Sequence, residues 1–199
     1  MAKRLFDLLV SLLALLLLSP LLLLLALAVR LDSPGPVLFR QQRVGRHGAL
    51  FRIHKFRTMR VDAEAIGPQI TAAHDLRITR VGNWLRGRRF DELPQLIDVL
   101  RGDMSLVGPR PEVPRYVAHY PQALKARVLA QRPGITDPAA LAFLDEAALL
   151  AGAADPETVY LQTVLPRKLA LQADYADSAT LWSDLGVMVR TLCLLLGRR

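Results

Sequence analysis

The chain begins with an apolar run over residues 8–29 that is interrupted at its midpoint by Ser19 and Pro20. A straight bilayer crossing needs about 20 residues of continuous helix at about 1.5 Å per residue, and each limb of this run reaches only about half that length. Proline removes a helical hydrogen bond and clashes with the preceding turn. The Ser19 hydroxyl is placed to bond a carbonyl freed in this way. The pattern therefore predicts a re-entrant membrane helix broken at Ser19-Pro20.

Basic residues lie on both sides of the apolar run. They are Lys3, Arg4, Arg30, Arg40, Arg43 and Arg46. Positive charge favours the cytoplasmic side of a membrane, so both ends of the segment are drawn to that side. We expect a hairpin-like segment, residues 1–31, that enters and leaves by the same face.

Two other interpretations of the segment stay open. A secretory signal peptide would explain the basic start and the small-residue pattern at Ala26 and Ala28, although its apolar region is usually about 7 to 15 residues long. A simple spanning anchor also fits the composition. It would place the strongly basic remainder of the chain outside the cell, against the charge rule.

Composition limits the rest of the chain. Its 199 residues hold the membrane segment and one domain, residues 32–199, large enough to bury its own core. The net charge of +8 predicts a polyanionic partner such as lipid headgroups, a phosphate-rich substrate or nucleic acid. Aromatic residues make up only 6% and do not alternate with basic ones, which argues against nucleic acid. The single Cys193 forms no internal disulfide, and we expect it to be buried.

Hydrophobic spacing predicts an α+β, mostly helical fold. After the turn at 32–36, residues 37–40 and 50–56 are typical of a small β-hairpin around a turn at 45–48. Residues 63–74 are expected to be irregular. Helical spacing covers 78–86, 93–100, 115–129, 139–151, 157–174 and 179–196. The last of these is amphipathic, and its pattern fits an interfacial helix and a helix packed on the domain equally well.

The densest group of chemical side chains lies between Arg86 and Pro111, where arginines bracket Asp91 and Glu92. Pro94 prefers the first turn of a helix, so the two carboxylates are predicted at a helix N-terminus. The helix dipole favours negative charge there, and we expect Asp91 to remain ionised. Such a carboxylate suits covalent or metal-assisted phosphoryl chemistry. An ordinary N-cap role for Asp91 fits equally well.

Further basic residues are candidates for phosphate binding. Lys55 and Arg57 alternate on a predicted strand and are expected to share one face, which is either a phosphate site or a solvated surface. Arg110 is held between two prolines, and its planar guanidinium group is suited to bind a phosphate. Arg132 lies in a similar Pro-Gly turn with the same ambiguity. The four histidines, His47, His54, His74 and His119, have no metal-ligand spacing, and no Walker loop is present.

Five motifs taken in order resemble the bacterial sugar transferase family, the monotopic phosphoglycosyl transferases. They are Ser19-Pro20, SPGPVLFRQQRVG (33–45), KFRTM (55–59), DELPQLIDVLRGDMSLVGPRP (91–111) and RPGIT (132–136). The resemblance implies an enzyme at the cytoplasmic face of the bacterial inner membrane. It would use Mg²⁺ to transfer a phosphosugar from a UDP-sugar to undecaprenyl phosphate, releasing UMP, in the first membrane step of glycan assembly. A non-enzymatic basic adaptor for acidic lipid or nucleic acid remains the alternative.

The resemblance also assigns roles to residues. Asp91 would be the nucleophile that forms an aspartyl phosphosugar intermediate, and a magnesium contact, with Glu92 as its partner. Lys55, Arg86, Arg110 and Arg132 would bind substrate. Ser19 and Pro20 would form the membrane break.

The C-terminal third departs from the pattern of larger members, which often continue RPGITG with Trp-Ala-Gln. Here Asp137-Pro138-Ala139-Ala140 follows Thr136, and the membrane-spanning extension of larger members is lacking, so the resemblance implies a minimal catalytic unit. The sugar, the glycan pathway and the oligomeric state stay open, as does docking of a downstream glycosyltransferase. Roles are not assigned to Asp145, Glu146, Asp155 and Lys168.

Overall fold

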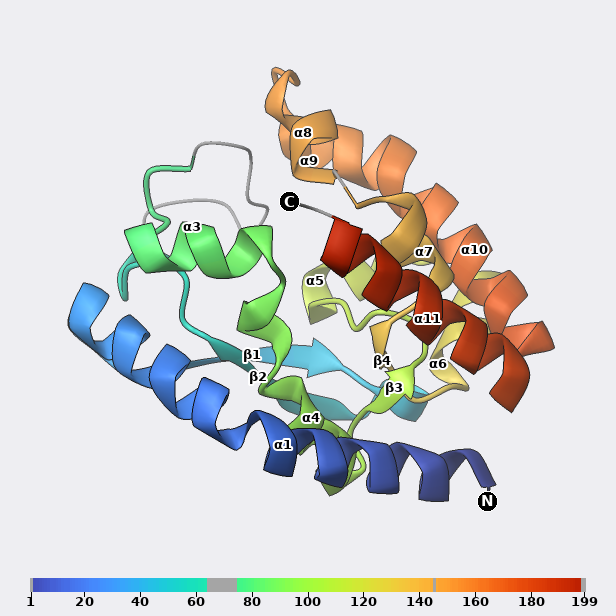
Figure 1. Ribbon diagram of the computed structural model, residues 1–199. Helices are drawn as coiled ribbons and strands as arrows, with labels where there is room; N and C mark the ends of the chain where they lie inside the picture. Colours follow the sequence, from blue (N-terminus) through green and yellow to red (C-terminus); the bar gives the residue numbers. More distant parts are fainter. Residues whose placement is uncertain (1, 64–74, 145, 198–199) are drawn as a thin grey trace.

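The computed structural model describes residues 2–63, 75–144 and 146–197. Helix α1 (Ala2–Asp32) is one continuous helix of 31 residues with Pro20 inside it. Its ribbon changes direction near the midpoint (Figure 1). The Ser19 hydroxyl donates to the Leu16 carbonyl at 2.8 Å, the carbonyl that Pro20 leaves without its helical donor. The predicted compensation by Ser19 is confirmed, whereas the helix is bent rather than divided into two limbs.

Both ends of α1 are attached to the rest of the molecule. Near the start, the Lys3 ammonium donates to the Val107 carbonyl at 3.1 Å and forms an ion pair with Asp184. Near the end, the Arg57 guanidinium donates to the Val29 carbonyl at 3.3 Å. Helix α1 is therefore joined to the rest of the molecule near both of its ends.

The two sides of α1 have opposite character. On the inner side Asp7 and Ser11 are buried, and Asp7 accepts a hydrogen bond from the Ser105 hydroxyl at 2.8 Å. Only 11% of its most apolar window is buried, so α1 is not a core helix. The outer side exposes Leu5, Leu9, Leu12, Leu13, Leu16, Leu17, Leu23, Leu24, Leu27 and Leu31. The helix is long and apolar enough to cross a membrane.

The predicted hairpin is confirmed. Strands β1 (Leu38–Val44) and β2 (Leu50–Phe56) pair antiparallel, with Phe39 opposite Lys55, and a short 3-10 turn, Arg46–Gly48, joins them.

A second small sheet was not predicted from the sequence. It consists of parallel strands β3 (Ser105–Val107) and β4 (Gly134–Thr136). A Cβ on Gly134 would lie 2.1 Å from the Gly108 nitrogen, so only glycine permits this approach. The sheet brings the turn that carries Arg110 against the segment that follows Gly134.

The helices after the hairpin match the predictions in part. Helix α3 (Arg80–Gly87) and helix α4 (Gln95–Arg101) confirm the predictions for 78–86 and 93–100. The others are α5 (Pro114–Val117), α6 (Gln122–Leu129), α7 (Pro138–Ala142), α8 (Glu146–Ala151), α9 (Pro156–Val159), α10 (Leu165–Ser178) and α11 (Leu181–Gly197).

Two single-helix predictions were wrong. The span 115–129 is split because Pro121 is extended (ψ 135°), and the span 139–151 is split after Phe143, which leaves helical geometry (ψ 42°). The span 157–174 is continuous, although residues 160–164 adopt π-helical geometry between α9 and α10. The prediction for 63–74 falls almost entirely outside the described residues.

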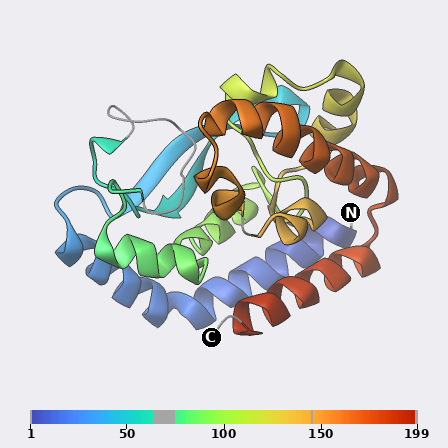
Figure 2. The ribbon, with the colours of Figure 1, turned by 90° about the horizontal axis from the view of Figure 1, so that it is seen from above.

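Helices α1 and α11 lie on the same side of the molecule, away from α6 and α10 (Figure 2). Helix α11 packs inward through Asp184 and Val187 and exposes Trp182 and Leu192, so it is both docked and amphipathic. Cys193 is exposed on this helix, and the prediction that it is buried was wrong because it faces away from the core.

Candidate active site

A cavity of about 1200 Å³ lies between the hairpin, the segment that joins α3 to α4, and the C-terminal helices. It is rich in charge. Its basic lining includes Arg40, Arg43, Lys55, Arg60, Arg86, Arg89, Arg110 and Lys168, and its acidic lining consists of Asp91, Glu92, Glu112 and Glu146 among the described residues. This excess of cations suits a phosphate-bearing ligand.

The carboxylates Asp91 and Glu92 lie in a 3-10 turn, Phe90–Glu92, that precedes α4. Neither this turn nor α4 has a side-chain cap, so the N-cap interpretation of Asp91 was wrong. The turn begins at Arg89 with φ of 59°, a left-handed conformation that costs a non-glycine residue about 1 kcal/mol. The surrounding packing must hold this turn, which directs both carboxylates into the cavity.

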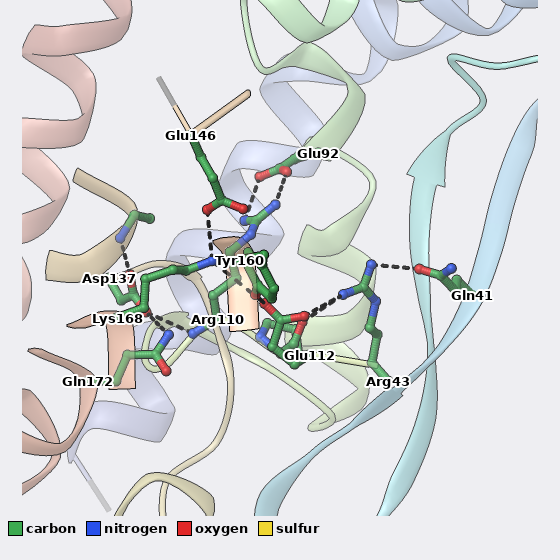
Figure 3. Close-up of polar contacts among 12 residues, drawn as sticks. Gln41, Arg43, Glu92, Arg110, Glu112, Asp137, Glu146, Tyr160, Lys168 and Gln172 are labelled. Atoms are coloured by element: carbon green, nitrogen blue, oxygen red, sulfur yellow. Dashed lines mark hydrogen bonds and ion pairs between the residues drawn. The ribbon is translucent and has the colours of Figure 1, made fainter. Parts of the chain in front are cut away.

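Glu92 is held by two cations from distant parts of the chain. The Lys55 ammonium donates to Glu92 Oε1 at 2.9 Å. The Arg110 guanidinium donates to both oxygens of Glu92, at 3.0 Å for Oε2 (Figure 3). Burial opposes ionisation, but Arg110 and Lys55 hold the pKa of Glu92 well below its ordinary value. Glu92 is thus an ionised acceptor that orients both cations.

Asp91 is buried beside Glu92 but makes no hydrogen bond or salt bridge to the described residues. Burial and the Glu92 charge raise the pKa of Asp91, while Lys55 and Arg86 act in the opposite direction. Burial and the like charge of Glu92 thus act against the predicted effect of the helix dipole, and the ionised state of Asp91 stays a prediction. Asp91 is the carboxylate of the pair whose oxygens remain available to a ligand.

The other predicted basic residues lie in different places. Arg86 of α3 lines the cavity and interacts with Asp91, while burial lowers the pKa of its guanidinium. Arg132 does not line the cavity, and its Nε donates to the Gly102 carbonyl at 3.0 Å.

Arg57 does not share the direction of Lys55. Strand β2 ends at Phe56, and the guanidinium of Arg57 turns to the exit of α1, where it donates to the Ser33 carbonyl at 2.6 Å and the Pro34 carbonyl at 2.7 Å. Both residues line the cavity, but the guanidinium of Arg57 does not point the same way as the Lys55 ammonium, because the strand stops one residue earlier.

A second polar cluster on the cavity wall was missed in the sequence. At its centre Glu112 accepts a hydrogen bond from the Tyr160 hydroxyl at 2.5 Å and lies 3.7 Å from Arg43 and 3.6 Å from Lys168 (Figure 3). Burial opposes ionisation, but Lys168 and Arg43 keep the pKa of Glu112 below its ordinary value. These residues are separated along the chain, and of Glu112, Tyr160 and Lys168 only Lys168 was named from the sequence, without a role.

The C-terminal segment is joined to the Arg110 turn through Asp137. The Asp137 side chain caps α7 and accepts hydrogen bonds from the Arg110 backbone nitrogen at 2.8 Å and the Gln172 amide at 2.7 Å (Figure 3). Asp137, the first residue at which the chain departs from the Trp-Ala-Gln pattern, therefore helps to position a cation of the cavity.

A buried pair behind the cavity joins the hairpin to α4. The ring Nδ1 of His54 lies 2.5 Å from an oxygen of Asp98, and the His54 backbone nitrogen donates to the other oxygen at 2.9 Å. This contact ties the strand of Lys55 to the helix that follows Glu92. His74 lies outside the described residues, and within the described ranges no group of three or more metal-ligating side chains is present.

Comparison with known proteins assigns the chain. The family model of the bacterial sugar transferases matches residues 1–198. This chain belongs to the bacterial sugar transferase family. The membership predicted from the ordered motifs is confirmed, and it agrees with an apolar helix and a basic cavity in one molecule.

Several relatives of this bacterial sugar transferase are undecaprenyl-phosphate enzymes by name. The UDP-glucose:undecaprenyl-phosphate glucose-1-phosphate transferase of Caulobacter vibrioides is 44% identical, over 98% of this chain and 69% of the relative. The undecaprenyl-phosphate glucose phosphotransferase of Komagataeibacter xylinus is 40% identical, over 96% of this chain and 35% of the relative. The UDP-glucose:undecaprenyl-phosphate glucose-1-phosphate transferase of Escherichia coli (strain K12) is 47% identical, over 67% of this chain and 29% of the relative. The chain thus spans about two thirds of the first relative and about a third of the other two.

Proposed function

We propose that this bacterial sugar transferase transfers a sugar 1-phosphate from a UDP-sugar to undecaprenyl phosphate and releases UMP, as the first membrane step of glycan assembly. The observation that carries the proposal is the Asp91 carboxylate, which has no hydrogen-bond partner among the described residues although it lies in a basic cavity. The names of the relatives supply the donor and acceptor classes.

The reaction would proceed in two displacements at one phosphorus atom. An Asp91 oxygen attacks the sugar-bearing phosphorus of the UDP-sugar, a P–O bond forms, and the bond to UMP breaks with its electron pair leaving on UMP. An oxygen of undecaprenyl phosphate then attacks the same phosphorus and releases the Asp91 carboxylate. Lys55 and Arg110, oriented by Glu92, would stabilise charge on the transferring phosphoryl group.

Asp91 would also hold Mg²⁺. Proteins usually bind this ion through one or two carboxylates together with substrate phosphates and water, so a single available carboxylate fits such a site better than it fits a full protein cage. When bound, Mg²⁺ would neutralise charge on the diphosphate. The chain itself contributes Asp91 as the ligand and Arg86 as a neighbouring cation.

We further propose that α1 is re-entrant, with its outer leucines in the bilayer and both ends at the cytoplasmic face of the inner membrane. Lys3 at one end and Val29 at the other contact the same domain, which a straight crossing would separate. Helix α11 lies on the same side of the molecule as α1 (Figure 2), and with its exposed Trp182 and Leu192 it would sit in the interface. Cleavage after Ala28 would remove a helix that packs into the fold.

Membrane topology is tested by cysteine labelling in cells. The exposed native cysteine is first removed as Cys193→Ser, and single cysteines are then introduced as Ala2→Cys and Leu31→Cys. A membrane-impermeant thiol reagent should reach both sites only from the cytoplasmic side. Labelling of the two sites from opposite sides would reject the re-entrant arrangement and support a spanning anchor.

The activity is tested with purified protein in detergent, Mg²⁺, undecaprenyl phosphate and a panel of UDP-sugars, with UMP release as the measurement. UMP formation that depends on undecaprenyl phosphate for repeated turnover supports the proposal. Absence of UMP with every sugar, together with salt-sensitive binding to acidic vesicles, would support the adaptor function instead.

A further inference from the structure

The cavity has two walls of different chemistry. Around Asp91, the guanidinium groups of Arg86 and Arg89 form no salt bridge within the described residues. On the other wall the cations are neutralised, since Lys168 lies between the carboxylates of Glu112 and Glu146, at 3.6 Å and 2.9 Å. A diphosphate is therefore attracted more strongly to the first wall, with its unpaired guanidinium groups, than to the second wall, where the charges balance.

The two carboxylates of the second wall differ in what they can still accept. Glu112 is 12% exposed and already contacts Tyr160, Arg43 and Lys168. Glu146 begins α8, and its side chain is 30% exposed. One of its oxygens accepts a hydrogen bond from Lys168, whose own side chain is 7% exposed (Figure 3). Glu146 therefore keeps acceptor capacity toward the cavity, because an ionised carboxylate has about four lone-pair sites.

Lys168 fixes the direction of this carboxylate. Its ammonium also lies over the Tyr160 ring at 5.3 Å, so it is held from a second side. A buried cation with three such partners has little freedom, and it orients the Glu146 carboxylate, which retains an accepting oxygen. Such an oriented acceptor suits an uncharged ligand part that donates hydrogen bonds, which in a UDP-sugar means hydroxyl groups.

We propose that Glu146, positioned by Lys168, accepts hydrogen bonds from the sugar hydroxyls of the UDP-sugar and so selects which sugar is transferred. This inference rests on the proposed function of the same cavity. It assigns the diphosphate to the wall of Asp91 and the sugar ring to the wall of Glu146. A site built to pair with a hydroxyl discriminates against substrates in which that hydroxyl is absent or misplaced, by up to about 10⁴-fold.

The test measures kcat/KM for UMP release with UDP-glucose, UDP-galactose and their two N-acetylhexosamine counterparts. The variants are Glu146→Gln and Lys168→Met, and the control is Asp174→Asn, a carboxylate of α10 that is 77% exposed and outside the cavity. Glu146→Gln should reduce the preference for the best sugar over its epimer by about tenfold or more, mainly through KM. Lys168→Met should reduce the same preference, and the control should keep the wild-type ratio.

An unchanged ratio in Glu146→Gln, or an equal loss for all four sugars, would overturn the inference. If Glu146→Gln does not fold, Glu146→Asp keeps the charge, withdraws the oxygens by one methylene, and should still alter the ratio. UMP release by the wild-type enzyme tests the proposed function separately. Wild-type turnover with unaltered selectivity in the variants would reject the sugar site alone, whereas absence of wild-type turnover with every sugar rejects the function.

Discussion

The guanidinium of Arg110 donates to both carboxylate oxygens of Glu92, although the two residues are 18 positions apart. The pair also separates the roles of two adjacent acidic residues. Glu92 is occupied by cations, while Asp91 has no such partner among the described residues. The two adjacent carboxylates look equivalent in the sequence, but Glu92 orients two cations, while the oxygens of Asp91 are available to a ligand.

Replacing the available carboxylate should abolish the chemistry. Asp91→Asn has nearly the same shape but is a poor nucleophile, so we expect UMP release to fall by more than about a thousandfold while the protein still reaches the membrane. Asp103→Asn, an exposed carboxylate on the loop after α4, is the matched control and should retain activity. Turnover of Asp91→Asn near the wild-type rate would exclude Asp91 as the nucleophile.

Glu92→Gln should lower both activity and stability. It leaves Lys55 and Arg110 as buried cations without their partner, which typically costs about 3 kcal/mol in free energy of unfolding. Because the pKa of folded Glu92 is depressed, its contribution is present above the unfolded value of 4.5 and is lost as pH falls through the folded value.

The measurement for Glu92 is denaturant unfolding in detergent micelles at several pH values. The wild type should lose stability below about pH 4.5 more steeply than Glu92→Gln, in which the titrating group is gone. Parallel pH curves for the two proteins would show that Glu92 is not stabilised by Lys55 and Arg110.

Arg86→Gln should shift the pH dependence of UMP release. Asp91 must be ionised to attack, and the Arg86 charge favours that form, so its removal should raise the pKa of Asp91 further and move the acid limb to higher pH. Loss of a charged contact should also lower kcat/KM at neutral pH about ten- to a hundredfold. Arg167→Gln, an exposed residue of α10, should leave the profile unchanged. An acid limb that stays in place would show that Arg86 does not act on Asp91.

Gly134→Ala should destabilise the small parallel sheet. The added Cβ would lie 2.1 Å from the nitrogen and 2.4 Å from the carbonyl oxygen of Gly108, and neither backbone atom can yield without moving the Arg110 turn. We expect a loss of about 1 to 3 kcal/mol in unfolding free energy, with reduced UMP release. Gly152→Ala, where no atom lies within 4 Å of the new Cβ, is the control. Equal stability of the two variants would contradict the close packing.

Local patterns in the sequence were sufficient for some elements and insufficient for others. The β1–β2 hairpin was predictable because alternation and turn glycines are local signals. The β3–β4 pair was not predictable, since each strand has only three residues and its partner lies more than 20 residues away in the chain. The break at Pro121 was overlooked because helical spacing continues on both sides of it.

The candidate site divides in the same way. Asp91, Glu92, Lys55, Arg86 and Arg110 were recognised because they lie in compact motifs, and the fold brings all five to one cavity. Arg132 belongs to an equally clear motif but bonds Gly102 outside the cavity. Glu112 and Tyr160 were missed, and Lys168 was named without a role, because residues from three distant segments meet only after folding.

The order of amino acids alone specifies the apolar first helix, its bend at Pro20, the hairpin and the acidic pair among arginines, because these depend on neighbouring residues. The tertiary structure determines which carboxylate forms ion pairs, which arginines face the cavity, and which C-terminal residues line it. These properties depend on contacts across tens of residues, and on burial, which no local pattern reports. The distinction between Asp91 and Glu92 is therefore a product of tertiary packing, through Lys55 and Arg110.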